Sequence, residues 1–501
     1  MKPFQEKLVA AWRDYAAGRI DAKTLKGQSA GFGIYQQRDD ATMMRLRRPG
    51  GVVTTGDLRA IAALLTTFKA PFCHLTTRLD IQLHGIKAAD VPAALEACEA
   101  HGFPFRGGGG DTFRNVQVNA CSGLHADTAF DVIPYARAFS TAFYSFDTAY
   151  GLPRKIKIGF VDRVADRQLA TVQDLGFVAK IENGRRVFET WVAGGIGFKP
   201  RVGLKIFDAL PAEDCARLAF ALTRLFDAKG CRTNRAHARI RFLREDLGDA
   251  AFVAQLKEAF ARETAAPVLS EANLLPEEWP QTKFTVDQTP APGFAAWKQL
   301  AATPLANGTY AVRLFVPYGN MTTAQLVKLC DALELEGVTK MHLLVWGDFA
   351  VPNVPENQLP AFYNLLVGSL GDVDYTVKSF KGHILTCVGS SICKIGANDS
   401  PAFGTAIAAA FDRDLPADTP EKIAQARLVL NDIRISGCPN CCTNTPLAKF
   451  GFLCRKVGDQ LAVMPLTGAV AEPSRLGELQ RDVIPCADVA DWISAHGAAV
   501  F

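Results

Sequence analysis

The sequence predicts an α+β protein with three lobes, built from two halves that are related by a pseudo-twofold axis. Three observations predict this fold class. The 501-residue chain is too long for one hydrophobic core. One unit occurs twice in the chain, and each copy alternates between strand and helix patterns. Each copy is also followed by a segment of different character, which predicts a second, mixed-sheet domain in each half.

The composition describes an ordinary globular protein and narrows the class of function. Hydrophobic residues make up 49% of the chain and charged residues 21%. The net charge of +4 is too small to indicate nucleic acid or a membrane surface as a partner. No run of about 18 apolar residues occurs, so no bilayer-spanning segment is expected. The 13 cysteines are an odd number and the N-terminus is charged, which favours a cytoplasmic location over secretion.

The repeated unit begins near Arg45 in the first copy and near Arg313 in the second. The sequence MRLRRPGGVVTTGDLRAIAALL lies over VRLFVPYGNMTTAQLVKLCDAL without a gap. The same register continues to Asp80 and Asp348, so one constant offset relates all the matched positions. A gapless match of this length indicates an internal duplication.

Each copy has the order strand, turn, helix, strand, helix. The segments MRLRRP and VRLFVP alternate as strands do, and a Thr-Thr pair then supplies an N-cap. Leu58, Ile61 and Leu65 fall on one face of the helix that follows. The segments CHLTTRLDIQLHGI and MHLLVWGDFAV are expected to be the returning strands. This order fits a split β-α-β unit of ferredoxin-like topology.

The segments that follow the two copies run in parallel but carry different chemistry. After the first copy, GGGGDTFRNV leads into a predicted helix over 133–146 and then into YGLPRKIKIGF. After the second, HILTCVGSSICKIG leads into a predicted helix over 403–411 and then into DIRISGCPNCC. The first half therefore carries cations where the second carries cysteines.

These patterns divide the chain into six segments of stated boundaries. They are an N-terminal docking helix (1–30), a first ferredoxin-like repeat (31–105), a substrate- and cofactor-binding domain (106–275), a proline-rich linker (276–304), a second ferredoxin-like repeat (305–375) and a cysteine-bearing domain (376–501).

Four cysteines near the C-terminus indicate an iron–sulfur cluster. Two of them form C-x5-C and two form C-x3-C, and a [4Fe–4S] cluster needs one thiolate for each iron. The four are Cys387, Cys393, Cys438 and Cys442. The competing interpretation is a structural zinc site, because Cys438 and Cys441 have the C-x2-C spacing that zinc sites use. A C-x5-C pair is unusual for zinc and no histidine-rich partner lies nearby, so the cluster is favoured.

The segment LPRKIK carries two lysines that indicate an anion site. Lys155 and Lys157 are two residues apart, so on a strand both ammonium groups point to one side. Two such charges repel unless an anion lies between them. Surface ion pairs are the ordinary explanation for any one of these cations.

With these motifs in hand, the sequence resembles the sulfite/nitrite reductase hemoprotein family. The resemblance runs over nearly the whole chain, from GIYQQR (33–38) to the last cysteine loop. It rests on TTRLDIQLHGI, FRNV, LPRKIK, GGIGFKP and the two cysteine pairs. It implies sirohaem coupled to a [4Fe–4S] cluster, and the six-electron reduction of sulfite to sulfide or of nitrite to ammonia.

The resemblance also implies roles for individual residues. The four cysteines would bind the cluster, and Cys442 would bridge it to the sirohaem iron. The substrate anion would be held by four cations, namely Arg78, Arg114, Lys155 and Lys157. Sirohaem carries eight carboxylates, and the cations expected around its rim are Arg45, Arg47, Arg106, Lys199 and Arg201.

The same resemblance bears on substrate and donor. Nitrite reductases of the family typically have asparagine at the position of Lys157, so the lysine favours sulfite, with nitrite as the alternative. The family commonly has glutamine after TTR, where this chain has Leu79. No flavin or NADPH motif is visible, so a ferredoxin or a flavoprotein subunit is expected to supply electrons. Two competing classes are the related oxygenase of cobalamin synthesis and an iron–sulfur sensor or carrier without haem.

Overall fold

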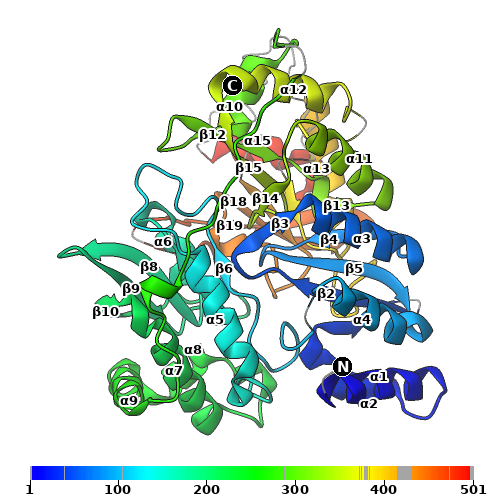
Figure 1. Ribbon diagram of the computed structural model, residues 1–501. Coiled ribbons are helices and arrows are strands. Elements are labelled where there is room, and N and C mark those ends of the chain that lie inside the picture. Colours follow the sequence, from blue (N-terminus) through cyan, green and yellow to red (C-terminus); the bar gives the residue numbers. More distant parts are fainter. Residues whose placement is uncertain are drawn as a thin grey trace.

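The computed structural model describes residues 3–38, 40–103, 105–285, 288–371, 373, 375–376, 382, 384–414, 432–472 and 474–496. Figure 1 shows three lobes. The N-terminal helices and the first repeat lie on the right, residues from about 120 to 265 lie at the lower left, and the second repeat lies at the top. The α+β fold with internal pseudo-symmetry is therefore confirmed.

The first repeat forms a five-stranded sheet, to which it contributes four strands, with two helices packed on it. Its own strands lie in the order β1-β2-β5-β4, and every pairing is antiparallel. The elements are β1 (Ile34–Gln36), β2 (Ala41–Arg47), β3 (Val52–Thr54), α3 (Thr55–Thr67), β4 (Phe72–Leu75), β5 (Asp80–Lys87) and α4 (Val91–Ala100). The segment predicted as one returning strand is thus a hairpin, because residues 76–79 turn between β4 and β5.

The second repeat copies the first element by element. Its strands lie in the order β11-β12-β15-β14. The elements are β11 (Ala302–Pro304), β12 (Thr309–Leu314), β13 (Asn320–Met321), α11 (Thr323–Leu335), β14 (Lys340–Leu343), β15 (Phe349–Pro355) and α12 (Leu359–Val367). Even the helix caps correspond, since Thr54 with Asp57 and Thr322 with Gln325 form the same capping box.

The two repeats exchange one strand each. Strand β13 of the second repeat pairs with β4 of the first, and β3 of the first pairs with β14 of the second. Helices α3 and α11 lie side by side, and Arg59 on α3 forms ion pairs with Asp331 and Glu334 on α11. This exchange places the pseudo-twofold axis between the two sheets.

The duplication continues into the domains that follow the repeats. The first has the strand order β10-β9-β8-β7-β6 and the second β16-β17-β18-β19-β20, with β21 beside β19. Strands β7, β8 and β9 correspond to β17, β18 and β19 at one constant offset in the sequence, and their registers agree. For example, Ile158 pairs with Leu175 and Ile433 pairs with Phe450.

The bounds of these domains follow. The first contains β6 (Gln117–Val118), α5 (Ile133–Ser145), β7 (Ile158–Val161), α6 (Arg167–Thr171), β8 (Leu175–Glu182), β9 (Arg185–Val192), β10 (Leu204–Pro211), α7 (Cys215–Lys229), α8 (Ile240–Leu247) and α9 (Asp249–Arg262). The second contains β16 (Ile384–Thr386), α13 (Ser400–Asp414), β17 (Ile433–Ser436), β18 (Phe450–Val457), β19 (Gln460–Thr467), β20 (Glu478–Leu479), β21 (Ile484–Pro485) and α15 (Val489–Ala495).

Two boundary predictions need correction. The N-terminal segment forms two helices, α1 (Pro3–Ala16) and α2 (Ala22–Ser29), because Asp21 caps a second helix through the backbone N–H of Thr24. The proline-rich segment 276–304 contains a helix, α10 (Phe294–Ala301), and strand β11, so the second repeat begins inside it. No helix among the described residues has both the length and the apolar character needed to span a bilayer.

Candidate functional site: a cation cluster facing a cysteine loop

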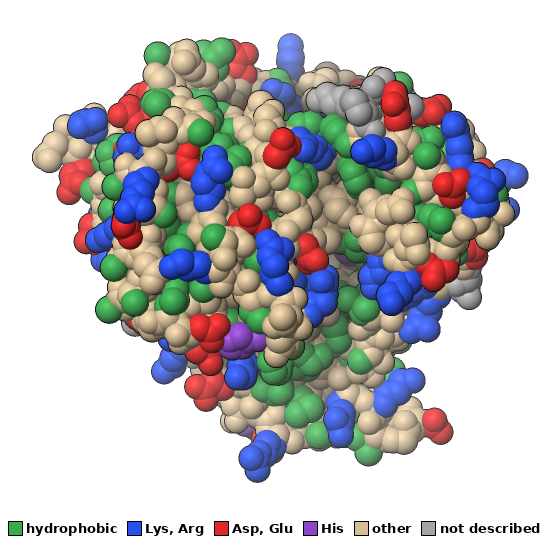
Figure 2. Space-filling model, turned by 90° about the horizontal axis from the view of Figure 1, so that it is seen from below, with side chains coloured by type: hydrophobic (Ala, Val, Ile, Leu, Met, Phe, Trp, Pro, Cys, Tyr) green, Lys and Arg blue, Asp and Glu red, His purple; other side chains and the backbone are tan. Residues whose placement is uncertain are grey.

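The four predicted substrate cations come together in the structure. Arg78 lies in the turn between β4 and β5, Arg114 lies just before β6, and Lys155 and Lys157 lie in the extended segment before β7. Each lies within electrostatic range of at least one of the others, because their charges act on one another's pKa values. In Figure 2 a hollow lies near the middle of the face seen from below, with Lys and Arg side chains on its border.

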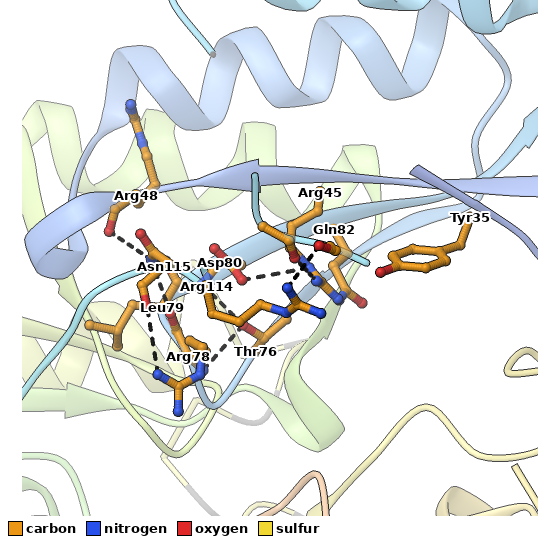
Figure 3. A network of polar contacts seen from close by, with 12 residues as sticks. Tyr35, Arg45, Arg48, Thr76, Arg78, Leu79, Asp80, Gln82, Arg114 and Asn115 are labelled. Carbon is orange, nitrogen blue, oxygen red and sulfur yellow. Dashed lines mark hydrogen bonds and ion pairs between the residues drawn. The ribbon is translucent and has the colours of Figure 1, made fainter. Parts of the chain in front are cut away.

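The turn that presents Arg78 is tightly held. Leu79 is fully buried and has a left-handed backbone with φ of 58°, an uncommon conformation for a residue of this type. The side-chain amide of Asn115 donates to the carbonyls of Arg48, Arg78 and Leu79 at 3.0–3.1 Å. Figure 3 shows Asn115 between these backbone segments. The turn is therefore clamped against the neighbouring strand, and Arg78 Nη2 donates to Gln173 Oε1 at 3.0 Å.

Arg114 is anchored by the glycine-rich loop 107–110. Its guanidinium donates to the carbonyls of Gly109 and Gly110 at 2.8 Å and to that of Thr112 at 3.0 Å. Gly109 has no room for a side chain, because a Cβ there would lie against Ala30 and the hydroxyl of Tyr35. Burial lowers the pKa of Arg114 to about 9. The glycines thus let their backbone carbonyls approach the Arg114 guanidinium closely.

The two lysines carry lowered pKa values. Burial is the first cause for both, and Arg239 is among the neighbouring charges that lower them further. Both side chains nevertheless remain half-exposed. Both ammonium groups are therefore surrounded by protein while part of each side chain reaches water, and we call this cation-lined region the hollow. Positive charges crowded in such a hollow favour an anion between them.

The sequence did not single out two further members of this cluster. Arg239 lies 11% exposed at the start of α8 and bonds the fully buried carboxylate of Asp174 at 2.7 Å. The same oxygen accepts from the backbone N–H of Lys157 at 2.7 Å. Arg239 belongs to the segment TNRAHARIRF, where Arg239 and Arg241 stand two residues apart, and no pattern in the sequence marks Asp174.

Cys442 faces the lysines from the cysteine loop. Its side chain is exposed, yet burial by surrounding protein raises the pKa of the thiol to about 12. The charges of Lys155 and Lys157 act in the opposite direction. Thr77 also donates its hydroxyl to the carbonyl of Cys442 at 2.8 Å. The cysteine loop therefore lies beside the turn that carries Arg78, and its thiol opens into the same hollow.

The other three cysteines gather around the same point. Gly437 N–H donates to the Cys387 sulfur at 3.5 Å, and Cys393 is influenced by the charges of Cys387 and Cys438. All four are free thiols. Among the described residues, no three His, Cys, Asp or Glu side chains surround a point where a single metal ion could bind. A [4Fe–4S] cube is different, since each thiolate binds a separate iron.

Two of the five predicted rim cations lie at the site. Arg45 donates to the carbonyl of Gly108 and lies 3.5 Å from the carboxylate of Asp80. Arg47 is 3% exposed, its guanidinium lies over the Phe113 ring at 4.9 Å, and its Nη1 has no hydrogen-bond partner among the described residues.

The other three predicted rim cations lie beside other partners or along a groove. Arg106 bonds Asp147 and the carbonyl of Tyr144, both at 2.6 Å. Lys199 is exposed, and Arg201 lies 3.8 Å from Asp249. Lys199 and Arg201 line a groove of about 750 Å³ whose wall includes Cys441, so this groove borders the cysteine loop.

The remaining cysteines are buried in all but one case. The buried ones are Cys73, Cys98, Cys121, Cys215, Cys330, Cys454 and Cys486. Cys231 is only half-buried, because it lies in the loop after α7.

Comparison with known proteins identifies the family. The pattern described as "Nitrite and sulphite reductase 4Fe-4S domain" matches residues 109–264, and "Nitrite/Sulfite reductase ferredoxin-like half domain" matches 35–101 and 304–368. The chain belongs to the sulfite/nitrite reductase hemoprotein family. The second ferredoxin-like match confirms the internal repeat, and the four cysteines lie outside the matched residues.

Some relatives are named nitrite reductases and others sulfite reductases. The ferredoxin–nitrite reductase of Synechococcus elongatus is 27% identical over 90% of this chain and 84% of its own length. The sulfite reductase [ferredoxin] 1 of Mycolicibacterium paratuberculosis is 24% identical over 98% of this chain and 88% of its own. The structure of the Mycobacterium tuberculosis NirA protein has a TM-score of 0.77 at 20% identity, covering 98% and 92% of the two chains, and so shares the fold.

Members of this family contain sirohaem and a [4Fe–4S] cluster, and the residues present fit both groups. For the cluster there are four free thiols, and Cys387 and Cys438 act electrostatically on both Cys393 and Cys442. For a carboxylate-rich tetrapyrrole, buried guanidinium nitrogens of Arg47, Arg239 and Arg241 lack partners among the described residues. Such orphaned donors are costly unless an acceptor reaches them.

Proposed function

We propose that this protein reduces sulfite to sulfide, a six-electron reaction, at a sirohaem coupled to the cluster. The observation that carries the proposal is the convergence of Arg78, Arg114, Lys155 and Lys157 on one hollow that Cys442 faces from the other side. In this arrangement Cys387, Cys393, Cys438 and Cys442 hold the cluster, and Arg45 and Arg47 contact the tetrapyrrole. When bound, the coupled groups supply electrons one at a time to the substrate.

The cations bind and orient the anion. Arg78 offers a rigid fork of donors, and the two lysines offer point charges from the neighbouring segment. Lys157 favours sulfite, because a near-dianion gains more from a second ammonium group than the monoanion nitrite does. Removal of oxygen as water requires protons, and the pKa of both lysines is lowered by burial and by Arg239. A lowered pKa suits a lysine to donate a proton in this hollow.

Electrons come from a separate protein. Relatives of this chain are named as ferredoxin-dependent enzymes, which supports a ferredoxin as the donor, with a flavoprotein subunit as the alternative. Thirteen cysteines, all free where the structure describes them, are consistent with a reducing, cytoplasmic compartment.

The proposal is tested by steady-state kinetics with reduced methyl viologen and each anion. The holoenzyme is expected to give a larger kcat/KM for sulfite than for nitrite. A larger value for nitrite would reject the sulfite assignment.

Reduction of nitrite to ammonia is the second candidate. Several relatives named nitrite reductases, from cyanobacteria and plants, support it at 24–27% identity. The same cations serve either anion, so the two candidates differ in the role of Lys157 and are separated by the assay above.

A further inference from the structure

Asp174 occupies an unusual position in the cation cluster. Its carboxylate is fully buried, and one oxygen, Oδ2, accepts both from the backbone N–H of Lys157 and from the guanidinium of Arg239. Both distances are 2.7 Å. The other oxygen, Oδ1, has no hydrogen-bond partner among the described residues. A single acceptor atom therefore fixes one substrate cation through its backbone and a second cation through its side chain.

The duplicated half shows which part of this arrangement is structural. At the same offset that relates Ile158 to Ile433, Lys157 corresponds to Asp432 and Asp174 corresponds to Lys449. There Asp432 Oδ2 accepts from the backbone N–H of Lys449 at 2.9 Å. The same two positions are therefore linked by the same kind of backbone-to-carboxylate bond, with the acidic and basic residues exchanged.

This exchange has a functional consequence in the half that holds the cations. An aspartate at position 157, as at Asp432 in the other half, would link the two segments equally well. It would, however, place a negative charge at the anion site. With the carboxylate at 174, the backbone stays fixed while the side chain at 157 is free to be a cation. The carboxylate also pairs with Arg239, which would otherwise repel the lysines beside it.

We propose that Asp174 is a positioning residue for anion binding, which holds Lys157 and Arg239 side by side at the substrate hollow. The inference deepens the proposed function, since it rests on the hollow being the site where the anion is reduced. It requires that a change at Asp174 alters anion affinity through Lys157 and Arg239, beyond any effect on folding.

The test uses the holoenzyme with Asp174→Asn and reads anion binding directly. Sulfite is titrated into the oxidised protein while the Soret band is followed, and KM and kcat are measured separately for sulfite and nitrite. We expect about a tenfold rise in Kd and KM, with normal chromophore content and a smaller change in kcat. Unchanged Kd and KM in a fully loaded variant would overturn the proposal.

A matched control and a second variant keep the test independent of folding. Asp432→Asn removes the carboxylate charge from the counterpart bond in the other half and is expected to change Kd by less than about twofold. Arg239→Met leaves Asp174 its bond to Lys157, and should weaken anion binding even if Asp174→Asn does not load its cofactors. The double variant Asp174→Asn, Arg239→Met should raise Kd little beyond either single variant, because the two residues act as a unit. Fully additive effects, or equal losses in the control, would reject the positioning role.

The outcome is separable from that of the proposed function. If nitrite proves to be the better substrate, the sulfite assignment fails, whereas the effect of Asp174→Asn on nitrite affinity still decides this inference.

Discussion

Trp346 occupies, in the second ferredoxin-like repeat, the position that Arg78 occupies in the first. The two are related by the same offset as Arg45 and Arg313, and each comes shortly before one of the matching aspartates Asp80 and Asp348. The Trp346 ring lies 4.2 Å from the guanidinium carbon of Arg434. An arginine at the proposed anion site in one half is thus replaced by an aromatic ring that packs against the cysteine-bearing domain in the other.

This replacement predicts the cofactor content of the protein. Arg313, Trp346 and Asp348 line a pocket with a volume of about 10 Å³, which is the space of a single water. The duplicated position therefore has no room for a tetrapyrrole in the described part of the chain. Quantifying the extracted chromophore per chain should give about one sirohaem, and about two would contradict the closure of this position.

Lys157→Asn should shift the preference between anions. The variant loses one positive charge while the backbone bond to Asp174 is kept. We expect kcat/KM for sulfite to fall by about tenfold or more, and that for nitrite to fall less, since the dianion depends more on the charge. Methyl viologen assays with both anions measure this. Equal losses for the two anions would contradict the selectivity argument.

Cys441 and Cys442 form a matched pair for testing the cluster ligands. Cys442→Ser should abolish the coupling between cluster and haem and lower iron content, since Cys442 faces the lysines in the hollow. Cys441→Ser should retain both cofactors, because Cys441 is buried whereas Cys442 is exposed. Iron analysis and absorption spectra of anaerobically purified protein report the result. Loss of iron in Cys441→Ser alone would instead make Cys441 a cluster ligand in place of Cys442.

Gly109→Ala should destabilise the protein and displace Arg114. The added Cβ would meet the Tyr35 hydroxyl at 2.6 Å and the Cα of Gly33 at 2.7 Å, and backbone cannot move aside cheaply. A loss of about 2 kcal/mol or more in the free energy of unfolding is expected, together with weaker anion binding. Denaturant unfolding is the measurement. Gly27→Ala in α2 is the control, since nothing lies within 4 Å there and it should be neutral or stabilising.

The protein should lose stability as the pH falls from about 6.5 to about 4. His74 and His342 are buried equivalents in the two repeats, and burial lowers the pKa of each to about 4. In the unfolded chain both bind a proton at higher pH, so their contribution is full above about pH 6.5 and is lost as the pH falls.

The size of this loss of stability at low pH can be checked at one residue. His342→Phe should make the pH dependence of the unfolding free energy shallower by at most about 3 kcal/mol over this range. An unchanged slope in His342→Phe would reject the assignment.

The sequence predicted those parts of the site that a local pattern carries. The i, i+2 spacing of Lys155 and Lys157 indicated a common side, and the cysteine pairs indicated converging loops. Arg239 and Asp174 were missed because their significance arises from one shared oxygen atom, and no spacing in the chain announces that contact.

The rim cations could be proposed from the sequence only as charges near the right motifs. Arg106 bonds Asp147, whereas Lys199 and Arg201 line the groove beside Cys441. Which of these cations contact a tetrapyrrole stays a prediction. The fold class itself was predictable, since a duplication with preserved helix caps repeats the same local preferences twice.

The strand exchange between the repeats makes the halves mutually dependent during assembly. Neither sheet has its full set of five strands unless β3 and β13 have crossed to the opposite half. A chain cut within residues 276–285 would leave two fragments that each expose an unpaired edge, and such fragments should remain aggregation-prone apart and recover a native form only when refolded together. The hollow, assembled from both fragments, would appear only at that last step.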